Sequence, residues 1–297
     1  LFFLMLVFQG IWYTQGNYEY YVNDATLMNG AALFYKNFAG GGILLIIILA
    51  IITGTVLHKD IQYQMAGIMY TTPINQKKFF LGRFLSAYVI NLIIAFGMLI
   101  GMALTPYSGI GTPDKFGPMP WAQMFHGFFV LTAVNLLMLT MVCFSVIVFF
   151  KKMTAGYLSV FLLVMLFLVA ESTSDHAGDM TFYELLDPFT FVYTSSMMDA
   201  LPADQKNTGF LTFNSIFFLN RFIWIGGTSV FFLLAYRRFT FKQFIATGDR
   251  QKKSITESLK QRVFGRLSLP SLHLNFSPMD MVRKFWCLAR SVLLNVV

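Results

Sequence analysis

The chain has 297 residues, of which 56% are hydrophobic and only 12% are charged. A soluble chain carries about 25% charged residues, so this composition excludes an ordinary soluble domain and favours a membrane protein. The formal net charge of +8 lies mostly in short segments between apolar runs. It therefore indicates contact with anionic lipid headgroups and a cytoplasmic partner rather than with nucleic acid.

Apolar runs recur along the whole chain and predict membrane-spanning helices. A helix needs about 20 apolar residues to cross the hydrocarbon core of a bilayer. The first run is shorter, so we expect a truncated first span in a fragment that continues past residue 297. The sequence predicts an all-α, polytopic membrane protein with six transmembrane helices, near residues 1–13, 39–57, 84–106, 123–150, 156–170 and 216–236.

Short polar segments between the runs predict where helices begin and turn. Asn75 precedes the third run and is a plausible N-cap. Lys151 and Lys152 end the fourth run, and the fifth starts almost at once. We therefore expect a tight hairpin between the fourth and fifth spans.

The basic residues predict which side of the membrane each loop occupies. If the first run leads out of the cytoplasm, most Asp and Glu residues fall outside, and every Lys and Arg falls inside except Lys36, Lys115, Lys206 and Arg221. An excess of Lys and Arg marks cytoplasmic loops. We expect a multi-pass protein whose cytoplasmic segments are residues 58–83, 151–155 and 237–285.

The cytoplasmic segment between the second and third spans has helical periodicity. Ile61, Met65, Ile68 and Met69 fall at i, i+4, i+7 and i+8, on one face, and Pro73 ends the pattern. We predict an amphipathic helix over residues 60–70 that docks on a cytoplasmic partner. A helix whose apolar face only contacts lipid is the alternative.

The outer segment 171–215 is too long and too apolar for a free loop. Asp187 and Pro188 suggest an N-cap followed by proline at the first helical position. We expect short helices lying on or dipping into the outer leaflet, with a re-entrant turn at Leu186, Asp187, Pro188 and Phe189.

The C-terminal part has two sections. Residues 243–278 form a polar, basic linker, and residues 279–297 place apolar and basic residues on opposite helical faces. Such a helix lies in the membrane plane. The opening of a seventh span is the alternative for this segment, whose characteristic residues are Arg283, Lys284, Trp286 and Arg290.

Motifs for nucleotide and zinc chemistry are missing from the sequence. The dipeptide Gly-Lys of a phosphate-binding P-loop never occurs, nor does H-E-x-x-H or G-x-S-x-G. The acidic residues that surround His176 in the outer segment are read as a solvated loop rather than a metal site. We expect a chain that is not an enzyme and holds neither a cofactor nor a metal.

The apolar runs carry no Asp, Glu, Lys or Arg near their middles, and Glu171 and Arg221 lie near outer ends. Ion-coupled transporters usually place such groups at mid-membrane, so a secondary transporter is disfavoured. Asn91 and Asn135 are expected to form interhelical hydrogen bonds. Gly97 and Gly101 form a G-x-x-x-G pair that either marks close helix packing or arises by chance.

Three local sequences resemble the permease subunits of type-2 ABC exporters. Residues 65–74 (MAGIMYTTPI) and 77–84 (KKFFLGRF) are similar to the family's stretch after its second span, and residues 185–189 (LLDPF) resemble a Bacteroidetes subgroup. In that subgroup two permease halves precede a gluzincin aminopeptidase domain. The resemblance covers residues 1–242, and residues 279–297 look like the start of a second permease half.

The resemblance implies a bacterial inner-membrane permease that moves an unknown substrate with energy from a separate ABC ATPase. ATP and Mg would bind that ATPase, and a second permease half or a second copy would complete the assembly. Residues 60–70 would be the coupling helix. Two alternatives remain: an ATP-driven mechanotransducer or assembly factor, and a membrane anchor for a peptidase beyond residue 297.

Overall fold

A computed structural model describes residues 1–16, 26–40, 43–62, 75–109, 113–174 and 180–240. The regular elements in these ranges are all helical, which confirms the prediction of an all-α chain. The linker 243–278 and the amphipathic segment with Arg283, Lys284, Trp286 and Arg290 lie outside the described residues, as do Met65, Ile68 and Met69.

Four helices are long and apolar enough to cross a bilayer, so the chain is a membrane protein. The first comprises α6 (Gln76–Leu104) and the short η1 (Thr105–Tyr107). The second comprises α7 (Trp121–Gly127), a π-helical turn η3 (Phe128–Ala133) and α8 (Val134–Phe150). The other two are α9 (Met153–Ser174) and α13 (Ser215–Arg238).

The first two apolar runs form shorter or bent helices. α1 is Phe2–Gly16, and its apolar part, Phe2–Trp12, is shorter than a span. The second run does not begin at residue 39, because a helix, α3 (Ala31–Gly40), already precedes α4 (Ile43–Gln62). The two are bent by 41°, so they form either one broken span or a re-entrant pair. The structure thus establishes four spans, or five with this pair, and six remains a prediction.

Local capping explains where the spans begin and end. The Asn75 side-chain oxygen accepts hydrogen bonds from the backbone N–H groups of Lys77 at 2.9 Å and Lys78 at 3.4 Å, which confirms the predicted N-cap of α6. Asn214 caps α13 in the same way, through Phe217 N at 3.0 Å. Lys151 adopts a left-handed conformation that ends α8, and α9 starts two residues later. The predicted tight hairpin is confirmed.

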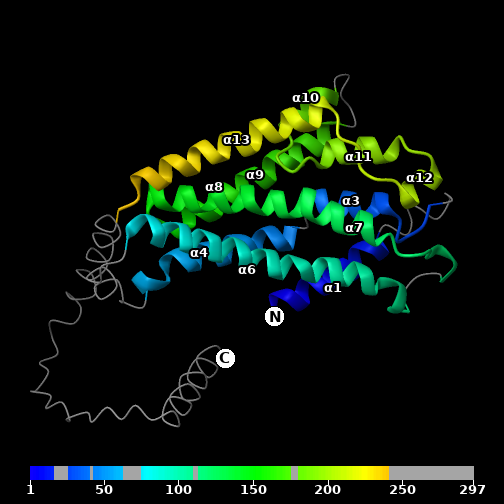
Figure 1. Ribbon diagram of the computed structural model, residues 1–297, viewed down its shortest axis with the longest axis horizontal. Helices are drawn as coiled ribbons and strands as arrows, with labels where there is room; N and C mark the ends of the chain where they lie inside the picture. The colour runs from blue at the N-terminus through cyan, green and yellow to red at the C-terminus, as the bar shows by residue number, and fades with distance from the viewer. Residues whose placement is uncertain (17–25, 41–42, 63–74, 110–112, 175–179, 241–297) are drawn as a thin grey trace, which may run out of the picture. The chain divides into compact units, whose positions relative to one another are not determined.

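The apolar core surrounds α8, which contacts α4, α6, α9 and α13 (Figure 1). Aromatic rings fill the space between α6, α8 and α13. The centroid of the Phe80 ring lies 5.1 Å from that of Phe144 and 5.4 Å from that of Phe232. The ring centroids of Phe84 and Phe232 are 4.4 Å apart. α9 and α13 are mostly exposed by comparison, and their outward side chains are apolar. This pattern suits helices whose outer faces contact lipid.

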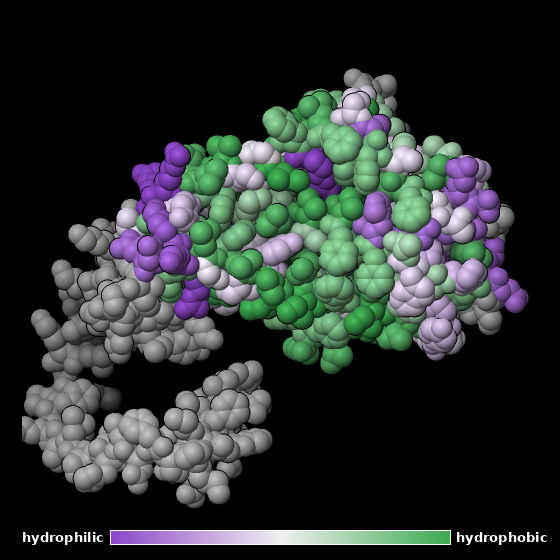
Figure 2. Space-filling model, in the orientation of Figure 1, coloured by the Kyte–Doolittle hydropathy of each residue, from purple (hydrophilic) through white to green (hydrophobic). Residues whose placement is uncertain are grey.

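Hydrophilic residues gather at the ends of the helices, and hydrophobic residues cover most of the surface between them, apart from one small hydrophilic patch (Figure 2). One end is basic: it carries the start of α6, the turn between α8 and α9, and the end of α13, with Lys77, Lys78, Lys151, Lys152, Arg237 and Arg238. Lys77 donates hydrogen bonds to the carbonyl oxygens of Tyr236 and, at 3.0 Å, Arg237, so the start of α6 caps the end of α13. We refer to this end as the basic end.

Glycine allows α1 to lie directly against α6. A Cβ atom at Gly101 would overlap the carbonyl group of Val7, and one at Gly97 would stand 2.6 Å from the carbonyl oxygen of Phe3. On the facing helix, a Cβ atom at Gly10 would meet the backbone of α6. The G-x-x-x-G pair therefore marks a close helix contact, as one of the two sequence-based interpretations held.

We expect Gly101→Ala to lower the melting temperature of the purified protein, because the backbone of α1 must move away from the added methyl group. Overpacking of this kind costs about 1–3 kcal/mol. Gly82→Ala is the matched control, since a Cβ atom there meets no atom within 4 Å in the same helix. It should raise stability slightly, by about 0.5–1 kcal/mol. Equal effects of the two variants on melting would contradict the packing described.

We also expect single cysteines at the two ends to be labelled from opposite sides of the membrane. Gln205 is exposed beyond the spans at the end away from Lys151, and Ser254 follows the basic end in the sequence. In a chain lacking Cys143 and Cys287, an impermeant maleimide should modify Gln205→Cys on intact cells and Ser254→Cys only after permeabilisation. Labelling of position 254 on intact cells would reverse the assigned sidedness.

Candidate functional site: a buried polar clamp at the outer ends of the spans

The segment between α9 and α13, called outer for the side that the charge distribution predicts, forms three short helices: α10 (Met180–Leu186), α11 (Phe191–Asp199) and α12 (Ala203–Thr208). Asp187 connects the first two. Its carboxylate accepts hydrogen bonds from the backbone N–H groups of Phe189 at 2.8 Å and Val192 at 2.9 Å. These bonds close a turn and satisfy the first turn of α11.

The predicted helix start at this point is wrong by several residues. Pro188 is not the first residue of a helix, because residues 187–190 form a turn and α11 begins at Phe191, with Thr190 as its N-cap. Asp187 still satisfies a helical N–H group, but from further upstream. The sequence identified a residue that binds the start of the helix but wrongly made it the N-cap, since Asp187 first folds the chain back through Phe189 and Thr190 is the N-cap.

Thr190 has an unusual backbone conformation, with φ of 60° and ψ of 25°. A β-branched residue rarely adopts the left-handed region, and such a conformation costs on the order of 1–3 kcal/mol. Three hydrogen bonds hold it. Its hydroxyl donates to Phe189 O at 2.6 Å and accepts from Arg221 Nη2 at 2.7 Å, while Thr194 donates to its carbonyl oxygen at 2.6 Å.

Arg221 joins the outer turn to the spans. It projects from the second turn of α13, is only 7% exposed, and donates from Nη1 to Asn135 Oδ1 at 2.7 Å. Asn135 in α8 donates in turn to Phe189 O at 3.2 Å and to Ala39 O of α3 at 3.3 Å. We call Asn135, Asp187, Thr190 and Arg221 the outer clamp. It links α3, α8, α13 and the α10–α11 turn.

A second set of bonds ties α10 to α13. Asn220 Nδ2 donates to the carbonyl oxygens of Glu184 at 2.7 Å and Asp187 at 2.8 Å. Trp224 Nε1 donates to Leu185 O at 3.0 Å. The last carbonyl groups of α10 have no partners within their own helix, so α13 supplies them.

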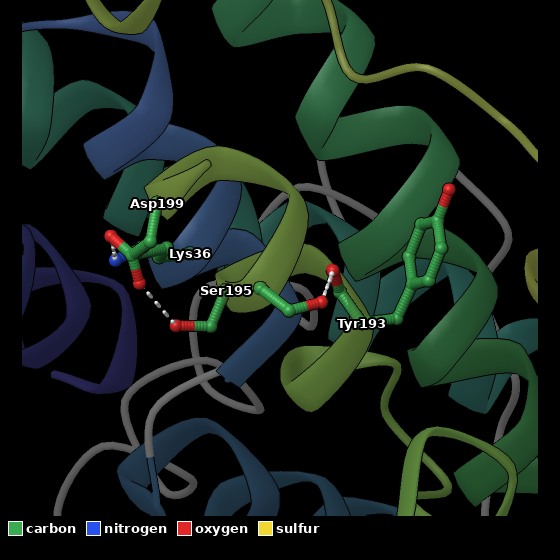
Figure 3. Close-up of polar contacts among 5 residues, drawn as sticks. Lys36, Tyr193, Ser195 and Asp199 are labelled. Atoms are coloured by element: carbon green, nitrogen blue, oxygen red, sulfur yellow. Dashed lines mark hydrogen bonds and ion pairs between the residues drawn. The ribbon is translucent and has the colours of Figure 1, made fainter. Parts of the chain in front are cut away.

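An ion pair ties α11 to α3 at the surface (Figure 3). Lys36 Nζ lies 2.6 Å from one oxygen of Asp199, and Ser195 donates to the other at 3.2 Å. Tyr193 points away from this pair, and its hydroxyl donates to Thr212 O at 2.8 Å. The exposed Asp199 makes this contact weaker than the buried clamp.

Burial raises the pKa of the Asp187 carboxyl to about 6. The backbone N–H groups that it accepts and the positive charge of Arg221 act in the opposite direction, but removal from water dominates. Asp187 therefore releases its proton near pH 6.

The structure places the predicted site residues as follows. Leu186 ends α10, and Asp187 and Phe189 are buried beneath the outer helices, with the Phe189 ring 5.5 Å from that of Phe167 in α9. Ile61 belongs to the last turn of α4, which continues to Gln62 without a separate helix starting at residue 60. The rest of the predicted coupling helix lies outside the described residues.

Asn91 and Asn135 both form the interhelical hydrogen bonds expected of them. Asn91 in α6 donates to the hydroxyl of Thr53 in α4 at 3.3 Å. Asn135 belongs to the clamp. The sequence-based interpretation placed Arg221 near an outer end but gave it no role, although an arginine within an apolar run is itself a signal of buried polar partners.

Chemically, the outer clamp is an anchor. Most of its donors and acceptors bind protein partners across four elements, with Arg221 Nε buried and unpartnered, and it holds the outer helices on the spans. Comparison of the chain with protein-family models, with curated proteins and with solved structures finds no match. The inference of function therefore rests on the sequence motifs and on this geometry.

We expect the thermal stability of the protein to depend on pH through Asp187. The folded state holds this proton more tightly than the unfolded chain does, so the stability that it contributes is full below pH about 4 and is lost as the pH rises through about 6. The free energy of unfolding changes by on the order of 2–3 kcal/mol. In melting curves between pH 4 and pH 7, Asp187→Asn should lack this loss.

Asp204→Asn is the control for this measurement, because it removes an exposed carboxylate of the same outer region. Its pH profile should follow that of the unmodified protein. If the melting temperature of Asp187→Asn depended on pH in the same way as that of the unmodified protein, titration of Asp187 would be excluded as the cause.

Proposed function

We propose that this chain is the transmembrane permease subunit of a type-2 ABC exporter in a bacterial inner membrane. It moves a substrate of unknown identity with energy from ATP hydrolysed by a separate cytoplasmic ATPase. The observation that carries the proposal is the distribution of charge along the four established spans. Their basic residues stand at one end, and the one cation further in, Arg221, is held by Asn135 and Thr190.

This distribution leaves no Asp, Glu, Lys, Arg or His in the described middles of the spans for an ion gradient to act on. Secondary transporters place such groups along the ion path. Arg221 does not qualify, because it is fixed in a structural network near the outer end. ATP hydrolysis by a partner ATPase is then the energy source most consistent with the spans. ATP and Mg would bind to that partner.

The outer helices also support the proposal. Type-2 exporter permeases carry a helical outer segment between their last two spans, and α10, α11 and α12 occupy that position between α9 and α13. The outer clamp fastens these helices to three different parts of the bundle. A permease needs such a rigid outer layer so that movement of the spans changes access to the outside.

The exposed apolar faces of α9 and α13 suit a bilayer or a second permease half. The second half would come from the same polypeptide or from a second copy of the subunit. A membrane anchor for a peptidase or a mechanotransducer would use the same spans. Neither would move a solute across the membrane, whereas an exporter moves one when ATP is consumed.

We expect the purified chain in nanodiscs to show no ATP turnover until its partner ABC ATPase is added. Ile61→Asp with Ile68→Asp should abolish co-purification of that ATPase, since charges on the apolar face of residues 60–70 disrupt its docking. The measurement is the amount of ATPase retained on the tagged chain, with membrane insertion checked in parallel.

Tyr63→Asp with Tyr70→Asp is the matched control, because these positions lie on the opposite face of the same helical pattern. It should leave ATPase binding intact. Turnover by the chain alone, or undiminished co-purification with the Ile61/Ile68 variant, would count against the proposal.

A further inference from the structure

The turn between α8 and α9 carries two adjacent lysines at the basic end, of which Lys152 is exposed and Lys151 is half-buried. Lys151 ends α8 in a left-handed conformation, and its N–H donates to Ile147 O at 2.8 Å. Lys152 follows, and α9 starts at Met153. The hairpin is so short that both lysines must stand at its tip, beside the end of the spans.

Arg238 lies against the last turn of α8, just before these lysines. It is the last residue of α13, and its guanidinium carbon lies 5.7 Å from the centroid of the Phe149 ring, two residues before Lys151. Phe149 in turn stacks on Phe231 of α13 at 4.9 Å. We call Lys151, Lys152 and Arg238 the basic corner. A cation–π contact limits the freedom of the arginine and positions its charge.

The positive charge of the basic corner is not neutralised within the described part of the chain. Among the side chains that the structure describes, the one ion pair joins Lys36 to Asp199 at the outer end. Within the described residues, no carboxylate offsets the repulsion among the three cations, so an external anion would stabilise them. An anion of one or two charges fits this requirement.

Apolar surface continues directly from the basic corner along the spans. Phe150 precedes Lys151 and is 66% exposed. Leu234, 50% exposed, stands one turn before Arg238 on the same face of α13. Figure 2 shows the hydrophilic residues of this end giving way to hydrophobic ones along the helices. An acidic protein segment would match the charges but not this apolar continuation, whereas a phospholipid matches both.

We propose that the basic corner is a binding site for an anionic phospholipid of the inner leaflet, with the phosphate between Lys151, Lys152 and Arg238 and the acyl chains over Phe150 and Leu234. Arg238 forks toward phosphate oxygens, and the two lysines act as point charges. The site does not depend on the exporter assignment. It would make lipid composition a determinant of how the α8–α9 hairpin and the end of α13 are held together.

The test is a titration of the full chain, in detergent micelles, with phosphatidylglycerol, with native mass spectrometry reading the affinity of the first retained lipid. Each basic residue near an anionic surface contributes about a fivefold gain in affinity. Lys152→Gln with Arg238→Gln should therefore weaken this first binding by about 10- to 30-fold. The charge-conserving Lys152→Arg with Arg238→Lys should retain most of it, and phosphatidylcholine should bind weakly to every form.

Lys78→Gln with Arg237→Gln removes the same charge from the same end, outside the basic corner, and should change the affinity by less than about twofold. Equal losses in both charge-removing variants would mean diffuse attraction and would overturn the site. Unchanged phosphatidylglycerol affinity in the Lys152→Gln, Arg238→Gln variant would also overturn the site, whatever the result of the ATPase-binding experiment. Melting in phosphatidylcholine nanodiscs confirms that each variant is folded.

Discussion

A bilayer offers no water to satisfy backbone groups, and this constraint explains most polar contacts in the described bundle. At several helix ends among the spans, a side chain from another helix supplies the missing partner. Thr132 and Asn135 of the fourth predicted span donate to Phe38 O and Ala39 O, which are among the last carbonyl groups of α3. Asn220 and Trp224 do the same for the end of α10.

The same constraint explains why a buried arginine is tolerated near the outer ends of the spans. An isolated charge in an apolar environment is costly, and the cost falls when its donors have fixed partners and an opposite charge is near. Asn135 and Thr190 accept from the two terminal nitrogens of Arg221, and the charge of Asp187 is near, while Nε is left without a partner. The strained backbone of Thr190 is one cost of the arrangement, and it presents the hydroxyl that Arg221 requires.

The two ends of the described bundle consequently differ in character. Interlocking hydrogen bonds hold the outer end, so α3, α8, α11 and α13 are tied to one another through side chains that are largely buried. The basic end is held by aromatic packing and by Lys77 on the last carbonyl groups of α13, with most of its cations exposed. Movement coupled to a cytoplasmic partner is easier to accommodate at an end whose charged groups are not locked in a network.

The sequence by itself determined the features that depend on composition and near neighbours. Hydrophobic length located the four spans, and adjacent residues set the Asn75 cap and the turn at Lys151, because the groups that make these contacts are a few positions apart. The α3–α4 bend, the start of α11 and the role of Arg221 were decided only by tertiary structure. Arg221 and Asn135 are separated by 86 residues, and Asn135 and Ala39 by 96. No local pattern pairs residues at such distances, since their contact exists only after the helices have packed.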